Sequence, residues 1–104
     1  MIEGLAFRGS GVHGFQAFHP RHVVLRDCEF CFIGGAVWSR ERRIRFGNGV
    51  EIWDGGSDCT VEACLFDNIY DAGGTHQGGG VDHIPERLYF RNNTFTGCGL
   101  ATYE

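Results

Sequence analysis

One pattern of residues recurs four times along the chain, and this recurrence constrains the fold more than any other feature. Each copy has an apolar residue, a small residue or an amide three positions later, and apolar residues five and eight positions after the first. The copies span residues 7–15, 25–33, 61–69 and 90–98. Internal repeats of this kind are typical of stacked, structurally equivalent units. We therefore expect four such units.

Aligning the four copies places similar side chains in four columns. The columns are Phe7, Leu25, Val61 and Phe90; Ser10, Cys28, Cys64 and Asn93; Val12, Phe30, Phe66 and Phe95; and Phe15, Ile33, Ile69 and Cys98. We predict that the three apolar columns stack inside the protein. The column of small residues suits a tight bend or a hydrogen-bonded ladder of side chains.

The unequal spacing of the copies favours strands over helices. Successive copies start 18, 36 and 29 residues apart, which does not suit a repeat of two helices, whereas stacked strands tolerate loops of any length. Glycine occupies 17 of the 104 positions, as expected for many turns between short strands. An ordinary β-sandwich also has many short strands. Like residues stacked in register would exclude that alternative.

A second short apolar segment follows each copy, at residues 15–19, 36–39, 74–77 and 100–103. Alternation along these segments predicts four inward and four outward side chains. The inward set is Phe18, Val37, Thr75 and Thr102, and the outward set is His19, Trp38, His76 and Tyr103. In the longest repeat a third segment, residues 47–56, is expected to place Glu51 and Trp53 on its outer face.

Residues 61–74 (VEACLFDNIYDAGG) and 90–99 (FRNNTFTGCG) carry a family resemblance. They resemble the coil of right-handed parallel β-helix proteins, the pectate-lyase-like superfamily of carbohydrate-active proteins. The resemblance implies an all-β solenoid of about four rungs. It also implies that residues 1–104 form a single partial domain, truncated at both ends, whose partners include the remaining rungs of a longer chain.

Members of this superfamily hold polysaccharides along an exposed parallel sheet, and the resemblance implies the same partner here. Aromatic faces suit the apolar faces of sugar rings, so Trp38, Trp53 and Tyr103 are the candidate sugar platforms. Gln77 and Arg45 are further candidates for substrate binding. The rival interpretation is a non-catalytic adhesin or structural segment that uses the same surface for binding alone.

If the chain is an enzyme, the resemblance implies a glycoside hydrolase or a polysaccharide lyase. A hydrolase needs two carboxyl groups roughly 5 to 9.5 Å apart. We assign Asp71 and His76 as the acid/base centre and Glu51 as a second carboxylate. These residues point to catalysis only if they converge in one groove.

A lyase would need a different set of residues. Arg45 or His76 would serve as the base that removes the proton beside a uronate carboxylate. Lyases of this architecture often use calcium held by carboxylates, whereas no cofactor is expected otherwise. The candidate calcium ligands are Asp54, Asp58, Asp67 and Asp71.

Charge and hydropathy disfavour two classes of partner. The formal net charge is -4 and all nine basic residues are arginine, so a nucleic-acid partner is not expected. No apolar run reaches the roughly 20 residues that span a bilayer, and we expect no membrane insertion. The resemblance implies a secreted, cell-surface or periplasmic protein whose export signal lies outside this chain.

Cysteine and histidine give no metal-binding motif. The five cysteines have irregular spacing without paired CxxC motifs, so buried thiols are expected in place of a zinc site. His13, His19 and His22 are spaced unlike ligands on a strand, which favours positions in loops or at the rim. No metal is therefore predicted. Finally, an open stack exposes strand edges at both ends, so we expect the isolated chain to be marginally stable or prone to aggregate.

Overall fold

The computed structural model describes residues 1–80 and 82–104, and every regular element in them is a β-strand. The strands are β1 (Ile2–Glu3), β2 (Ala6–Arg8), β3 (Phe15–Phe18), β4 (Val24–Arg26), β5 (Glu29–Ile33), β6 (Val37–Ser39), β7 (Ile44–Arg45), β8 (Val50–Trp53), β9 (Ser57–Glu62), β10 (Leu65–Ile69), β11 (Ala72–Gln77), β12 (Glu86–Arg91), β13 (Thr94–Cys98) and β14 (Ala101–Tyr103). No helix in the described residues is long and apolar enough to cross a membrane.

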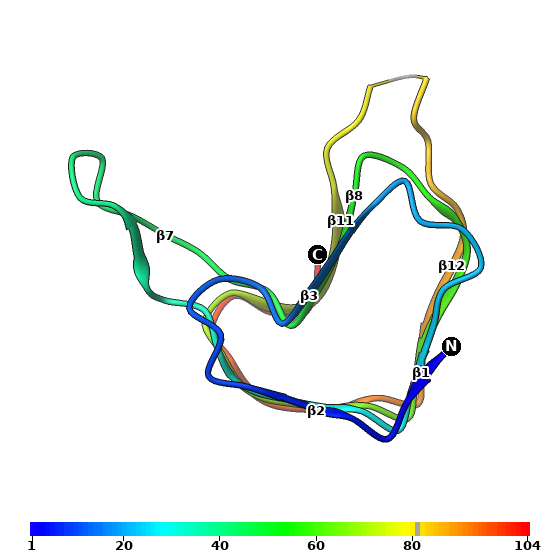
Figure 1. Ribbon diagram of the computed structural model, residues 1–104, viewed down its shortest axis with the longest axis horizontal. Coiled ribbons are helices and arrows are strands. Elements are labelled where there is room, and N and C mark those ends of the chain that lie inside the picture. The colour runs from blue at the N-terminus through cyan, green and yellow to red at the C-terminus, as the bar shows by residue number, and fades with distance from the viewer. Residues whose placement is uncertain (81) are drawn as a thin grey trace.

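Twelve of the strands form three four-stranded sheets in which all neighbours are parallel. The strand orders are β1-β4-β9-β12, β13-β10-β5-β2 and β14-β11-β8-β3. The chain therefore contributes one strand to each sheet before it returns to the first sheet. We call each such set of three strands a pass, and successive passes overlie one another (Figure 1). The shortest dimension is 19 Å, as expected for four strands spaced about 4.8 Å apart. Parallel pairing excludes the antiparallel sandwich.

The core contains the predicted stack of phenylalanines. The rings of Phe7, Phe30, Phe66 and Phe95 lie nearly parallel, with successive centroids 4.8, 4.9 and 4.9 Å apart. Phe30 and Phe66 are completely buried, and the residues packed around them come from all three sheets. Like residues stack because parallel strands in register place equivalent side chains side by side.

The predicted register is correct for the last three copies and wrong for the first. Phe30, Phe66 and Phe95 pair as expected, but their partner in the first pass is Phe7 and not Val12. Leu25 likewise pairs with Ile2. The first copy therefore begins five residues earlier than predicted. Ser10, Val12 and Phe15 match the spacing of the template, but residues 9–14 form no strand.

The small-residue column forms the predicted ladder in the last three copies. Cys28 Sγ lies 3.7 Å from the carbonyl oxygen of Ile2 in the preceding pass, and Cys64 Sγ lies 3.8 Å from that of Leu25. Each thiol also lies 3.3 Å from a carbonyl oxygen of its own pass, that of Arg26 or Glu62. Asn93 completes the series, because its Nδ2 donates to the carbonyl of Val61 at 3.0 Å. Each link joins one pass to the preceding one. Burial raises the pKa of the Cys64 thiol to about 11, so this thiol stays protonated.

The second segment of the longest repeat was assigned incorrectly. Residues 37–39 leave the parallel sheets as β6, which pairs antiparallel with β7 and projects from the body of the molecule (Figure 1). The strand that lies between β3 and β11 is β8. Val37, predicted to point inward, is 47 % exposed. A hairpin is favoured because residues 40–43 are polar and tolerate a solvated turn.

The predicted alternation along β3 and β11 was also reversed. Phe18 pairs with Trp53 and is 61 % exposed. His76, predicted to point outward, pairs with the buried Ile52 and so belongs to an inward row. Tyr103 pairs with Gly74, in the inward row that also contains the buried Val50. Tyr103 is nevertheless exposed, because β14 is an edge strand of this sheet in the described residues, and His76 is exposed near the end of β11.

Candidate functional site

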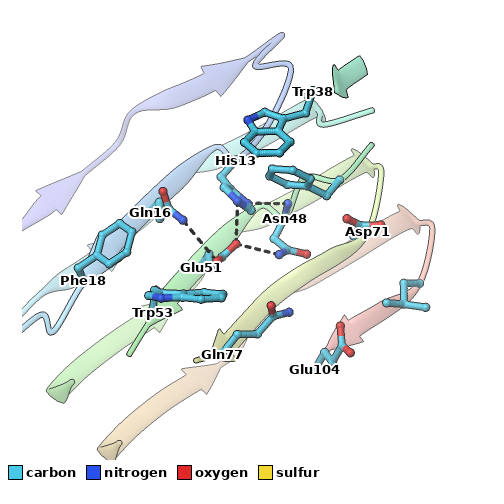
Figure 2. A pocket seen from close by; sticks show the side chains of 12 residues that line it. His13, Gln16, Phe18, Trp38, Asn48, Glu51, Trp53, Asp71, Gln77 and Glu104 are labelled. Atoms are coloured by element: carbon cyan, nitrogen blue, oxygen red, sulfur yellow. Dashed lines mark hydrogen bonds and ion pairs between the residues drawn. The ribbon is translucent and has the colours of Figure 1, made fainter. Parts of the chain in front are cut away.

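A groove of about 710 Å³ lies on the outer face of the sheet that contains β3, β8, β11 and β14 (Figure 2). The hairpin of β6 and β7 adds one wall. The residues that line the groove are His13, Gln16, Phe18, Trp38, Phe46, Asn48, Glu51, Trp53, Asp71, Gln77, Leu100 and Glu104. Aromatic rings and hydrogen-bonding groups thus share one concave surface, which is the usual composition of a ligand site.

Strand register arranges the centre of the groove in two rows across the sheet. The rows are Gln16, Glu51 and Thr75, and Phe18, Trp53 and Gln77. Because Val50 and Ile52 point into the core, alternation turns the side chains of Glu51 and Trp53 to the opposite face. The sequence prediction for these two residues is therefore correct in direction, although Glu51 is only 3 % exposed.

Glu51 is the centre of a hydrogen-bond network (Figure 2). Its Oε2 accepts from His13 Nε2 at 2.8 Å and from Asn48 Nδ2 at 3.1 Å. Its Oε1 has a single, longer contact with Gln16 Nε2 at 3.4 Å. The carboxylate therefore keeps acceptor capacity on Oε1, the oxygen with which a ligand hydroxyl would bond.

Hydrogen bonds from the backbone fix the tautomer of His13. The amide of Asn48 donates to His13 Nδ1 at 3.1 Å, so Nδ1 is an acceptor and the ring proton lies on Nε2, facing Glu51. Asn48 is fixed in turn, because its Oδ1 accepts from the amide of Ala72 at 3.0 Å. The loops before β3 and β8 and the first residue of β11 are thus joined by hydrogen bonds.

This network determines the charge of Glu51. Burial by itself would raise the pKa of this carboxyl, but the hydrogen bonds from His13, Asn48 and Gln16 outweigh burial and lower its pKa. Glu51 is therefore an anion at neutral pH. An anion can accept hydrogen bonds from hydroxyl groups, but it cannot donate the proton that a general acid must supply.

Aromatic side chains form two parts of the groove wall. Phe18 and Trp53 lie with ring centroids 6.4 Å apart at an interplanar angle of 58°. Trp38 packs against Phe46 at 5.7 Å and is 63 % exposed. The two tryptophans predicted as sugar platforms therefore line the same groove, one from β8 and one from the hairpin.

Two other predicted residues also reach the groove. Gln77 lies beside Trp53 in the same row. Asp71 lies just before β11, and its Oδ2 accepts from the amide of Gly47 at 2.8 Å. Asp71 and Glu51 thus line one cavity, as the hydrolase hypothesis requires. One carboxylate oxygen of Asp71 is already bonded to the amide of Gly47.

The remaining predicted residues lie outside the groove lining. His76 is five residues from Asp71, or roughly 16 Å along an extended strand, and its Nδ1 is 2.6 Å from the hydroxyl of Tyr103. This pair borders a separate hollow that is also lined by Pro85, Arg87 and Leu88. Arg45 is exposed on β7 and is not among the lining residues. Asp71 and His76 therefore do not form the acid/base centre that the sequence suggested.

Sequence reasoning missed several residues of the groove. Gln16 and Phe18 were overlooked because the alternation of β3 was reversed, and the correct register alone would have identified them. His13 lies in a loop between β2 and β3, as expected, but its side chain is only 10 % exposed and contacts Glu51. No local motif predicts the network around His13, because its partner Asn48 is 35 residues away in the sequence.

The four aspartates proposed as calcium ligands have separate partners. Asp58 pairs with Arg87, and Asp67 accepts from the hydroxyl of Thr96. Asp71 is bonded to the Gly47 amide. Asp54 instead contacts two histidines, His19 and His83, at a different corner of the molecule.

No family model, curated protein or solved structure matches this chain. The resemblance to the β-helix superfamily therefore depends on the residue template and on the parallel order of the strands. Functional argument accordingly starts from the chemistry of the groove itself.

Proposed function

We propose that this chain is a segment of a parallel β-helix and that its groove binds a neutral polysaccharide. The observation that carries the proposal is the row of Phe18, Trp53 and Gln77 beside the ionised Glu51. Aromatic rings can stack on the apolar faces of sugars, while carboxylate and amide groups bond their hydroxyls. Rows that cross the strands suit a polymer lying across several passes.

The charge of the groove favours a neutral glycan over a polyuronate. Three carboxylates line it, from Glu51, Asp71 and Glu104, and no arginine is among the lining residues that the structure describes. The His13 side chain is already paired with Glu51. An anionic sugar would therefore meet like charge without a compensating cation, which weakens binding.

Binding is favoured over cleavage by the protonation state of the site. A hydrolase pairs its second carboxylate with a general acid that holds a proton near neutral pH. Glu51 lacks that property, and the proposed partner His76 borders a different hollow. The same chemistry supports a non-catalytic surface-binding role.

The test is a binding assay with a panel of neutral and uronate polysaccharides. We expect Trp53→Ala to lower the affinity for the glycan at least tenfold, because losing a stacked aromatic at a binding hot spot costs more than about 1.4 kcal/mol of binding free energy. Trp38→Ala should also weaken binding. Tyr89→Ala is the control, since Tyr89 is 49 % exposed on β12, in another sheet. If the wild type and the three variants bind the glycan equally, the groove is not the binding site.

The same panel distinguishes binding from cleavage. Reducing ends report hydrolysis, and absorbance of unsaturated products reports elimination. We expect neither from the wild-type protein. Turnover that Glu51→Gln and Asp71→Asn both abolish would instead establish catalysis in the groove, and a preference for polyuronates would contradict the charge argument.

A further inference from the structure

A second cluster of polar side chains lies where β3 and β8 end, outside the groove. His19 Nε2 is 2.9 Å from Asp54 Oδ2, and His83 Nδ1 is 2.8 Å from Asp54 Oδ1. The two imidazole rings meet edge to face, with centroids 4.8 Å apart. We propose that His19, Asp54 and His83 form a binding site for a divalent transition-metal ion.

Strand register explains why His19 and Asp54 are neighbours. Phe18 pairs with Trp53, so the residues that follow them, His19 and Asp54, occupy equivalent positions on adjacent passes. Both have the left-handed backbone conformation, with φ of 46° and 60°. Each strand therefore turns sharply at the same point, and the turn directs both side chains to one corner.

The third ligand comes from the segment after β11, which packs closely over the Asp54 turn. A Cβ atom on Gly79 would lie 2.9 Å from the His83 carbonyl oxygen and 3.1 Å from Asp54 Oδ1. A Cβ atom on Gly55 would lie 3.1 Å from the same carbonyl oxygen. Glycine at these two positions is thus what permits the segment to bring His83 against Asp54.

The donor set selects the class of metal. Two imidazole nitrogens and one carboxylate oxygen suit Zn²⁺, Co²⁺ or Ni²⁺, whereas Ca²⁺ and Mg²⁺ prefer oxygen ligands. The three ligand atoms lie within 4.8 Å of one another. A common ion would form bonds of about 2.0 to 2.2 Å to these atoms, and both histidines are about half exposed and thus free to rotate toward it. Solvent can fill the remaining coordination positions.

This site differs from the expectation that the protein binds no metal. It was missed because its ligands come from three loops, and only His19 belonged to the histidine set considered in the sequence. Asp54 was considered as a carboxylate of a calcium site and not together with any histidine. Bound metal would join the turns of three passes at one corner, and should therefore stabilise the folded chain.

The test is titration of the untagged protein with Zn²⁺ by calorimetry and with Co²⁺ by visible absorbance. We expect one Zn²⁺ per chain, a raised melting temperature with Zn²⁺ and no comparable effect of Ca²⁺ or Mg²⁺. His19→Ala, His83→Ala and Asp54→Asn should each weaken Zn²⁺ binding at least tenfold. Asparagine suits the last position because it tolerates the left-handed conformation of Asp54.

Controls separate metal binding from folding and from other histidines. His76→Ala removes an exposed histidine that contacts Tyr103, and should leave Zn²⁺ affinity unchanged. Melting without metal verifies that each variant is folded. The proposal is overturned if the wild-type protein binds no Zn²⁺ at micromolar concentration. It is equally overturned if folded His19→Ala and His83→Ala proteins bind Zn²⁺ as the wild type does.

Discussion

At the scale of single residues, the groove is organised by a buried charge. Glu51 is almost fully removed from solvent, yet each of its hydrogen bonds comes from a side chain whose position is fixed by a different loop or strand. A buried carboxylate is tolerated only when it is bonded in this way. The network therefore stabilises the fold and also keeps the floor of the groove ready for a ligand.

Glu51→Gln should lower the free energy of unfolding by about 1.5 to 3 kcal/mol at pH 7, the usual contribution of hydrogen bonds to a charged group. The folded pKa of Glu51 lies below the ordinary value of 4.5. The stabilisation that ionised Glu51 contributes is therefore complete above pH 4.5 and is lost as the pH falls through the folded pKa. Urea denaturation at several pH values should show that the difference in the free energy of unfolding between wild type and Glu51→Gln narrows below pH 4.5.

Glu29→Gln is the matched control for this prediction. Glu29 also pairs with a basic side chain, Arg8, but both partners are about half exposed. Exposed ion pairs contribute only about 0 to 1 kcal/mol. A difference between Glu51→Gln and wild type that stays constant down to pH 3 would contradict the assigned role of Glu51.

At the scale of elements, the bends before the groove sheet depend on glycine. Gly49 lies just before β8, where an added Cβ atom would collide with the Gly73 carbonyl oxygen and the ring of Phe66. Gly14, just before β3, and Gly73, within β11, occupy the equivalent register positions on the neighbouring passes, and each has a similar conflict. Three passes can therefore approach one another at this corner only without side chains.

Gly49→Ala should destabilise the protein by at least about 2 kcal/mol, since the methyl group has no space without moving backbone. Thermal and urea unfolding would measure the loss. Gly80→Ala is the control, because a Cβ atom on Gly80 would meet nothing within 4 Å. Equal stability of the two variants would show that the Gly49 corner relaxes freely.

How far the sequence predicts these elements depends on how local their cause is. The columns of Phe30, Phe66 and Phe95 were predictable because one spacing creates them. The hairpin of β6 and β7 was not predictable, because the same apolar–polar alternation occurs in a parallel strand and in a hairpin. The groove was predicted in part, through Trp38, Trp53, Glu51, Asp71 and Gln77, but its network required contacts between distant loops.

At the scale of the whole molecule, the stack has two open ends. The edge strands are β1, β2 and β3 at one end and β12, β13 and β14 at the other. At the second end a hollow of about 440 Å³ is lined by four apolar or aromatic residues and one threonine: Leu88, Phe90, Phe95, Tyr103 and Thr102. Unpaired edges around an apolar hollow favour association with further strands.

We predict that the isolated chain self-associates through this end as its concentration rises. Thr102→Lys should shift the equilibrium toward monomer, because a charge within the hollow opposes burial of its apolar lining. Gly80→Lys adds the same charge at an exposed loop position, where a Cβ atom would meet nothing within 4 Å, and should have little effect. Light scattering after size exclusion measures both. A monomer at every concentration, with a sharp cooperative melt, would mean that the exposed end neither drives association nor weakens the fold, and that the four passes are stable as they stand.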